Sequence, residues 1–342
     1  MDSINFTKMT LDLPEQFQIA LDSAKVVDVS PLEGIEFTSI IVLGMGGSGV
    51  SGDVVSAVAS QSCKVPVIVC KNYELPEFVN ESTLVIAASY SGTTEETLSA
   101  LRSAQDKKAP LVAVCSGGEL ESIATNSLSP SVIYKAPAGL QPRASMGALV
   151  SPIMVVLDKL GLIPGAIEQC EQAVKQVTKR RNQCQDPNEK HIVSDLVTRI
   201  STTIPVIYGG GALGAVAAYR FKCDVNENAK TPAYWHYYPE LNHNEIVGYG
   251  QNGDVTRQLL TLVELRHDYE HAQVKRRFDI TRELIKETLH DIIEVNAEGT
   301  CYFAQLCDLM YIGSLASLFM ALNAGVDPGP VDVIWELKNA LA

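Results

Sequence analysis

The chain has 342 residues and a mass of 37.0 kDa, which at roughly 150 residues per domain predicts two domains. Hydrophobic residues make up 46% of it and charged residues 20%, a composition that excludes global disorder. The 27 Lys and Arg against 40 Asp and Glu give a formal net charge of −13, which excludes nucleic acid as a main partner because phosphate-backbone binding needs a basic face.

The N-terminal sequence lacks a basic segment followed by an apolar one, so we expect no signal peptide. Residues 310–326 are weakly polar but interrupted by two serines and Asn323. They predict a buried helix, because a membrane span needs roughly 20 mostly apolar residues. The eight cysteines include no C-x-x-C pair and favour reduced thiols. We therefore expect a cytoplasmic protein with no membrane partner.

Apolar runs of strand length alternate with longer helical stretches along the chain, a pattern typical of α/β folds with parallel sheets. In the first half the predicted strands are Ser39–Leu43, Val65–Cys70, Leu84–Ala88 and Leu111–Cys115, and the predicted helices are Ser51–Ser60 and Glu95–Ala104. In the second half the predicted strands are Ile204–Tyr208, Gln258–Glu264 and Ile292–Val295, with a helix over Ala212–Lys222.

A strand, a glycine cluster and a helix follow one another twice, with Gly44 aligned to Gly209. This weak duplication predicts two related α/β sandwiches. The polar segment Gln169–Glu189 is expected to be an exposed helix and connector. We interpret its basic triplet, residues 179–181, as a solvated face.

The pattern Gly44-x-Gly46-x-x-Gly49 after the first strand fits three interpretations: a dinucleotide turn, a structural glycine turn, or a site for another small anion or sugar. A dinucleotide site also needs an acidic residue at the end of the second strand to hold the ribose. That strand ends in Cys70 and Lys71, which argues against NAD.

A hydroxyl-rich loop, SYSGTTEET over Ser89–Thr97, follows another apolar strand and leads into a helix. Unsatisfied N–H groups at a helix start lie at the positive end of the helix dipole. Several hydroxyls added to them predict a phosphate site without Lys or Arg. The alternative is a plain Ser/Thr cap, which needs only one hydroxyl.

These two motifs together resemble a sugar isomerase (SIS) domain. Four further blocks narrow the resemblance to the bifunctional phosphoglucose/phosphomannose isomerase family, the short type with two SIS domains. They are LQPRASMG (140–147), NENAK (226–230), PELNHNEIVG (239–248) and GVDPGPVDVIWELK (325–338).

The resemblance implies two SIS-type doubly wound parallel-sheet sandwiches packed together. It predicts an N-terminal helical segment (1–33), a first SIS domain with the phosphate loop (34–155), a linker helix (156–190) and a second SIS domain with the catalytic Glu and His (191–342). It also implies a homodimer and an aldose–ketose isomerisation through a cis-enediol that needs no cofactor or metal. The implied substrates are glucose 6-phosphate and mannose 6-phosphate, each interconverted with fructose 6-phosphate.

By the same resemblance Glu227 is the base, Arg143 stabilises the enediolate, and His243 opens the sugar ring from the neighbouring subunit. Lys338 contacts the sugar. The phosphate and sugar are expected to bind at Gly46, Gly47, Ser48, Ser89, Ser91 and Thr94. Without the resemblance these residues have ordinary structural alternatives, such as a helix terminus, a loop salt bridge or a surface lysine.

Two departures from the family pattern stand out. Thr93 replaces a common Asn, and a hydroxyl still donates to phosphate. Gly329 replaces the Thr of a D-P-T-P tail, which puts the activity on the mannose epimer in question. His267 and His271 are four residues apart, but the first lacks the following Glu of zinc hydrolases, so we interpret them as an exposed helix face.

Two rival functions remain at this stage, besides an isomerase that acts on glucose 6-phosphate alone. A sugar-phosphate sensor with SIS domains needs the phosphate loop but not the Glu, Arg and His, and all three are present. An amidotransferase-type aminosugar isomerase needs a separate glutamine-hydrolysing domain, for which this chain has no room.

Overall fold

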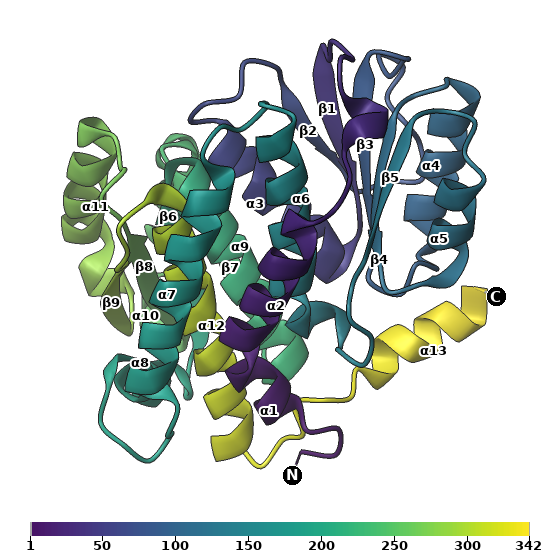
Figure 1. Cartoon of the computed structure of the whole chain (residues 1–342). Helices are drawn as coiled ribbons and strands as arrows, with labels where there is room; N and C mark the ends of the chain where they lie inside the picture. The colour runs from purple at the N-terminus through teal and green to yellow at the C-terminus, as the bar shows by residue number, and fades with distance from the viewer. Residues whose placement is uncertain (1, 342) are drawn as a thin grey trace. The chain divides into compact units, whose positions relative to one another are not determined.

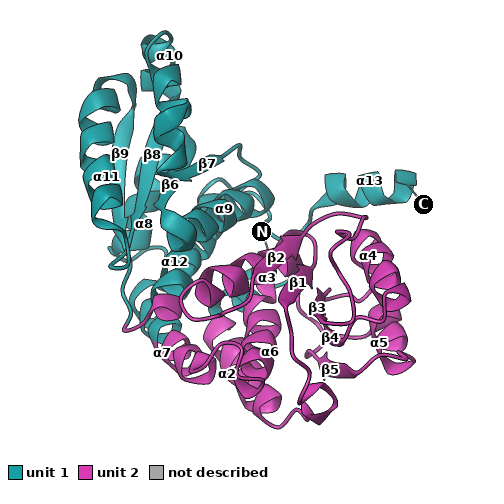
Figure 2. Ribbon diagram, turned by 90° about the horizontal axis from the view of Figure 1, so that it is seen from above, with its two compact units in different colours: residues 1–11, 176–299, 305–342 teal, residues 12–175, 300–304 magenta. Residues whose placement is uncertain are grey.

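The computed structural model describes residues 2–341, and each of its two compact units contains one parallel sheet (Figure 1). Unit 1 comprises residues 2–11, 176–299 and 305–341 of the described range, and unit 2 comprises residues 12–175 and 300–304 (Figure 2). The boundaries of these units differ from those of the four predicted parts, at residues 33, 155 and 190. One reason is that helix α2 (Leu13–Lys25) packs on α6 (Met146–Lys159), where the Phe17 ring lies against Gly147.

Unit 2 has a five-stranded, wholly parallel sheet in the order β2-β1-β3-β4-β5. The strands are β1 (Ser39–Leu43), β2 (Val67–Cys70), β3 (Thr83–Ala88), β4 (Leu111–Cys115) and β5 (Ser131–Lys135). The other elements are α3 (Gly46–Ala59), α4 (Glu95–Asp106), α5 (Gly118–Thr125), the 3₁₀ turns η1 (Ser30–Leu32) and η2 (Pro142–Ala144), and the start of α7 (Ala166–Cys184).

Alternate residues of the unit 2 strands pack on opposite faces of the sheet, as the pleat requires. Ile41 and Val85 belong to a buried cluster that includes Leu98 and Leu101 of α4 and Leu120 of α5. On the other face α3 approaches so closely that a Cβ on Gly52 would lie 3.0 Å from Val42 Cγ1. Because both faces are covered, the central strands are continuous apolar runs, and this is why the sequence identified them.

Unit 1 has a four-stranded parallel sheet in the order β7-β6-β8-β9. The strands are β6 (Ile204–Gly210), β7 (Tyr234–Tyr238), β8 (Leu260–Arg266) and β9 (Asp291–Asn296). The helices are α1 (Phe6–Leu11), the end of α7, α8 (Ile192–Ile200), α9 (Gly211–Asn228), α10 (Gly253–Leu259), α11 (Ala272–Ile285), α12 (Tyr302–Asn323, from residue 305) and α13 (Asp332–Leu341), with 3₁₀ turns η3 (Glu240–His243), η4 (Glu245–Tyr249) and η5 (Lys286–Thr288).

The core of unit 1 contains a buried ion pair that the sequence analysis missed. Arg180, in the basic triplet interpreted as a solvated face, is 3% exposed. Its Nε and Nη2 atoms each donate to the Asp308 carboxylate at 2.9 Å. That interpretation is wrong for Arg180, because an arginine on the inner face of an amphipathic helix needs a buried acidic partner that a sequence does not reveal.

The apolar helix α12 is the one described helix that is long and apolar enough to cross a membrane, and 89% of its most apolar window is buried inside the protein. It is therefore packed as a core helix, as predicted for residues 310–326.

The strands β5 and β7 were not predicted. Both lie at sheet edges, where one side is exposed, and their sequences SVIYK and YWHYY lack a continuous apolar run.

Candidate functional site

The glycine turn after β1 forms the start of α3, five residues earlier than predicted. The helix begins at Gly46, whose φ of +52° is unfavourable for other residues. The N–H groups of the first turn of α3 therefore lie at the carboxyl end of β1. In unit 2 this is the point where the strand order reverses between β1 and β3, the usual ligand-binding position in such sheets.

The serine loop (residues 89–94) follows β3, the strand beside β1, and its hydroxyls form a connected network. The Ser89 and Thr94 hydroxyls lie 2.9 Å apart, and Gly92 N donates to Ser89 Oγ. Ser48 Oγ accepts from Tyr90 N at 3.2 Å, which joins the serine loop to the first turn of α3. Since Ser48 accepts here, its own hydroxyl proton is available to an incoming anion.

Thr94 precedes α4 but makes no side-chain cap, so its hydroxyl is not used to satisfy the helix start. Ser91 and Thr93 are exposed and bond to each other at 3.1 Å. In the same first turn Thr97 is buried, and its Oγ1 has no hydrogen-bond partner among the described residues. The sequence analysis did not single out Thr97. This arrangement of uncharged donors at a helix start suits a phosphate group.

Arg143 lies beside the same glycine turn. A Cβ on Gly47 would come within 2.7 Å of Pro142 O and 3.1 Å of Arg143 Cα, so only glycine permits this contact. Tyr90 of the serine loop fixes the preceding segment, since its hydroxyl donates to Pro137 O and accepts from Leu140 N. Burial raises the pKa of Tyr90, so it stays a neutral hydrogen-bonding group.

The end of β2 carries an ion pair between Lys71 and Asp53 of α3. Burial raises the pKa of the Asp53 carboxyl, and the Lys71 ammonium opposes this shift. Lys71 Cε lies 3.1 Å from the Cβ position of Gly49, so the pair supports the glycine turn. A lysine, not the acid of a dinucleotide site, therefore occupies this strand end.

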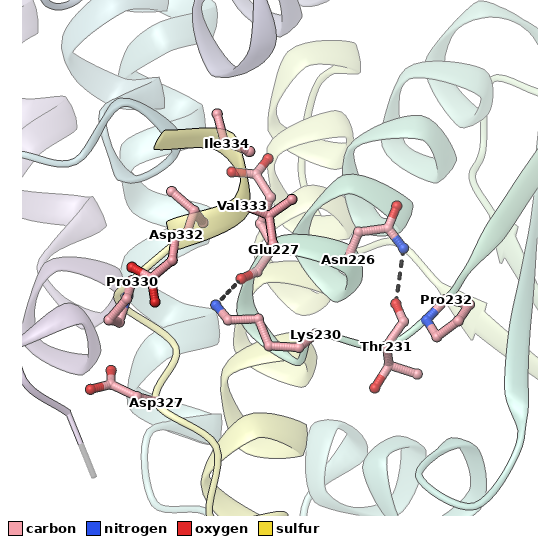
Figure 3. Close-up of a pocket in the computed structure, with 11 residues that line it drawn as sticks. Asn226, Glu227, Lys230, Thr231, Pro232, Asp327, Pro330, Asp332, Val333 and Ile334 are labelled. Atoms are coloured by element: carbon pink, nitrogen blue, oxygen red, sulfur yellow. Dashed lines mark hydrogen bonds between the residues drawn. The ribbon is translucent and has the colours of Figure 1, made fainter. Parts of the chain in front are cut away.

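In unit 1 a cavity of about 670 Å³ contains Glu227. Figure 3 shows the Glu227 side chain extending from the end of α9 toward the first turn of α13. The cavity is lined by Asn226, Glu227, Lys230, Thr231, Pro232, Asp327, Pro330, Val331, Asp332, Val333 and Ile334. Its size lies within the range typical of small-molecule sites. The two aspartates belong to the block at residues 325–338 but were not predicted as site residues.

Neighbouring side chains hold the end of α9 that carries Glu227. Arg220 and Asp224 form a buried ion pair, with Nη2 2.7 Å from Oδ1, and Ser314 of α12 donates to the Asp224 carboxylate. Asn228 donates to Ser317 of α12. After the helix end, Lys230 Nζ donates to the Glu227 carbonyl oxygen (Figure 3). The half-buried Glu227 therefore projects from a rigid helix terminus.

His243 and Lys338 do not line this cavity. His243 is exposed at the end of η3. The loop that carries it is held by Glu245, which accepts from the Tyr208 hydroxyl, and Tyr249 Oη lies 2.6 Å from Tyr208 Oη. Lys338 is exposed on α13, one turn beyond Ile334.

His267 is not on an exposed helix face, so that interpretation is wrong. It follows β8, is 7% exposed, and its Nε2 lies 2.8 Å from Gly210 O. Burial lowers the pKa of His267, so the ring is held neutral. His271 is the cap of α11 and accepts from Gln273 N. Among residues 2–341 no group of three or more His, Cys, Asp or Glu is placed to hold a metal ion.

Gly329 lies beside the cavity residue Pro330 but is not one of the lining residues. A Cβ there would come within 2.4 Å of Ile4 Cγ1. A larger residue at position 329 would therefore direct its side chain at the N-terminal segment of unit 1.

Two family models match the chain. Residues 36–156 match the SIS domain, and residues 190–341 match the bacterial phospho-glucose isomerase C-terminal SIS domain. Together they cover both sheets.

Curated relatives match over nearly the whole length. A protein of Caldicellulosiruptor bescii is 37% identical over 97% of both chains, and one of Aquifex aeolicus is 34% identical over 92% of both. Each is named a bifunctional phosphoglucose/phosphomannose isomerase. Among solved structures, the C-terminal domain of glucosamine-fructose-6-phosphate aminotransferase from Francisella tularensis matches with a TM-score of 0.70 at 15% identity, covering 94% of this chain and 96% of that one. This likeness shows the shared fold.

Proposed function

The chain belongs to the family of bifunctional phosphoglucose/phosphomannose isomerases, and on this basis we propose that it interconverts glucose 6-phosphate and mannose 6-phosphate with fructose 6-phosphate. The observation that carries the proposal is Glu227, a half-buried carboxylate at a rigid helix end in a cavity of small-molecule size. A carboxylate in such a cavity suits a reaction whose chemistry is proton transfer.

In the proposed reaction Glu227 removes the proton from carbon 2 of the open-chain aldose. The electron pair forms the double bond of a cis-enediol between carbons 1 and 2, and the carbonyl oxygen at carbon 1 takes up negative charge. The hydroxyl proton at carbon 2 passes to the oxygen at carbon 1, and Glu227 returns its own proton to carbon 1. Carbon 2 then carries the carbonyl group of the ketose. No electrons enter or leave the substrate, so the proposed mechanism uses no redox cofactor.

Arg143 is proposed to stabilise the enediolate oxygen, because a guanidinium stays charged through the reaction. The serine loop and the first turn of α3 are proposed to bind the phosphate. Their donors are uncharged and are positioned by hydrogen bonds. The Ser89 and Thr94 hydroxyls bond to each other, and Ser48 Oγ accepts from Tyr90 N. A phosphate dianion bound in this way contributes the same affinity to substrate and transition state.

His243 is proposed to open the sugar ring in the active site of a neighbouring subunit, which makes the enzyme a homodimer. His243 is exposed and does not line the cavity that contains Glu227. Val247, on the turn that follows, is 77% exposed. Lys338 is proposed to contact the sugar hydroxyls.

We place the enzyme in the cytoplasm, in the hexose phosphate steps of glycolysis and gluconeogenesis. The test is a coupled assay of fructose 6-phosphate formation from each aldose phosphate. Turnover of both supports the bifunctional assignment, and turnover of glucose 6-phosphate alone reduces it to a glucose-specific isomerase. Binding of both without turnover would favour a sensor.

A further inference from the structure

A second groove in unit 1 lies between α11 and the η3–η4 turns and has no part in the proposed reaction. It has a volume of about 350 Å³. Its lining combines polar and cationic side chains with an apolar wall: Asn242, Ile246, Gln273, Arg276, Arg277, Ile280, Thr281 and Leu284. Six of these come from α11, where they recur at positions that share one helix face.

The arginines of this groove differ from their neighbours in having no acidic partner. Arg266 and Arg282 pair with buried or half-buried carboxylates, as does Arg199. By contrast, Arg276 forms no ion pair with any residue in the range 2–341, and Arg277 donates only to the neutral Asn242 Oδ1. In a chain of net charge −13, two guanidinium groups without acidic partners at one groove form a local site of positive charge.

The groove also holds one of its arginines in position. Asn242 accepts from Arg277 Nη1 at 3.1 Å and donates to Thr281 Oγ1 at 2.8 Å. Arg277 uses one of its five N–H donors in this contact, so the others remain for a ligand. A guanidinium with an oriented fork binds phosphate oxygens with strong, charge-assisted hydrogen bonds.

We propose that this groove binds a small phosphate monoester, with the phosphate on Arg276 and Arg277 and the organic part against Ile246, Ile280 and Leu284. Gln273 supplies a further amide donor beside the phosphate. The apolar wall is what distinguishes a monoester from free inorganic phosphate, since the latter has no surface to bury there.

Occupancy of this groove is linked to the proposed ring-opening residue. Asn242 directly precedes His243 in η3, and its side chain is the contact between η3 and Arg277. A ligand that restrains Arg277 also restrains Asn242. We therefore expect the bound monoester to order residues 240–249.

The test is calorimetric titration with phenyl phosphate and, separately, with inorganic phosphate. The full chain carries Ser89→Ala and Thr94→Ala to weaken the proposed serine-loop site. We expect one phenyl phosphate per chain in this background, weakened at least tenfold by either Arg276→Gln or Arg277→Gln. Lys275→Gln is the matched control, because it removes the same charge from an exposed position on the same helix outside the groove, and it should change binding by less than threefold.

Two further readouts separate the alternatives. Leu284→Asn, at a 68% exposed position, should weaken phenyl phosphate and leave inorganic phosphate unchanged. Hydrogen exchange in residues 240–249 should slow when phenyl phosphate binds. Equal affinity in the arginine variants and in Lys275→Gln, or no phenyl phosphate binding at all, would overturn the proposal. If the serine-loop substitutions leave all phosphate binding intact while the arginine substitutions abolish it, the proposed catalytic phosphate site fails and the groove stands.

Discussion

The strand ends that follow β3 in unit 2 and β8 in unit 1 occupy corresponding places in their sheets, each beside the first strand of its unit. After β3 the chain presents hydroxyls in two neutral hydrogen-bonded pairs, Ser89 with Thr94 and Ser91 with Thr93. After β8 it presents Arg266 and Glu270, whose bidentate pair has Nε and Nη2 3.0 Å from the carboxylate oxygens, and His267 bonded to Gly210 O.

The fold gives both strand ends the same position before a helix, and the side chains decide whether an anion can bind there. Both strand ends lead into a helix, but at the second one the charged groups already satisfy each other, and Arg266 also lies 4.2 Å from the centre of the Phe278 ring. An anion arriving there meets an arginine whose charge is already paired with Glu270 and Glu294, whereas neutral hydroxyls can turn their protons toward it. Unit 2 is therefore the proposed phosphate-binding unit, and unit 1 contributes the proposed base from the far end of α9.

The division of roles predicts that the largest effect comes from the base in unit 1. Glu227→Gln keeps the side-chain shape but removes the proton acceptor, so turnover should fall by roughly 10²–10⁴ with little change in substrate affinity. Exchange of the carbon 2 hydrogen with deuterated water should stop in this variant. Asp332→Asn is the control, since it removes a negative charge from the same cavity and should cost less than tenfold. Turnover of Glu227→Gln within a few-fold of the parent rejects the assignment.

The next largest effect should come from the serine loop of unit 2. Ser89→Ala with Thr94→Ala removes two donors that bind the phosphate in ground and transition states alike. We expect KM to rise by roughly 10–100-fold, with turnover changed much less. Ser103→Ala removes a hydroxyl of α4 outside the serine loop, where it donates to Ser99 O, and should raise KM by less than threefold. If both variants keep the KM of the parent, the phosphate binds elsewhere.

A third prediction concerns the ion pair between Arg266 and Glu270 at the end of β8 in unit 1. Glu270 is buried, and Glu270→Gln leaves Arg266 with Glu294 as its remaining ion-pair partner. We expect a loss of about 2 kcal/mol in the free energy of unfolding, measured by urea denaturation, because a buried charge loses its closest partner. Glu283→Gln, at an exposed pair with Lys286 on the same helix, should cost about 0.5 kcal/mol or less. Equal losses in the two variants would contradict the contrast between the strand ends.

The sequence predicted every central strand and two of the four edge strands, β2 and β9, and it missed the edge strands β5 and β7 for a physical reason. Strands covered on both faces, such as β1 and β4, are uninterrupted apolar runs, and the structure confirms both with the predicted bounds. The edge strands β5 and β7 carry mixed residues and gave no such pattern. Ion pairs between distant residues also cannot be predicted from one sequence. Arg180 is an example, because its partner Asp308 lies 128 residues away.

For the site, the sequence identified the motifs, but within a motif it did not show which side chains are buried or line a cavity. Ser48 and Ser89 were predicted together, and the structure joins their loops through Tyr90 N. Thr97, Asp327 and Asp332 lie within quoted motifs, but only the burial of Thr97 and the cavity lining by the two aspartates single them out. The catalytic roles of Glu227, Arg143, His243 and Lys338 remain predictions that the variants must test.

The smallest expected effect is a pH dependence of stability that belongs to the strand end in unit 1. Burial lowers the pKa of His267, so the folded state binds this proton less readily than the unfolded chain. Its contribution to stability is therefore complete above the unfolded pKa of about 6.5 and is lost as the pH falls below it, by at most about 1.4 kcal/mol per pH unit. His267→Gln retains an N–H donor for Gly210 O and removes the titration. The urea midpoint of the parent should fall more between pH 7.5 and 5.5 than that of His267→Gln, while His290→Gln, at an exposed histidine, should behave like the parent. Parallel pH profiles for all three proteins would mean that the His267 ring takes up a proton in the folded state as easily as in the unfolded chain. The strand end after β8 would then differ less from the serine loop than its buried ion pair indicates.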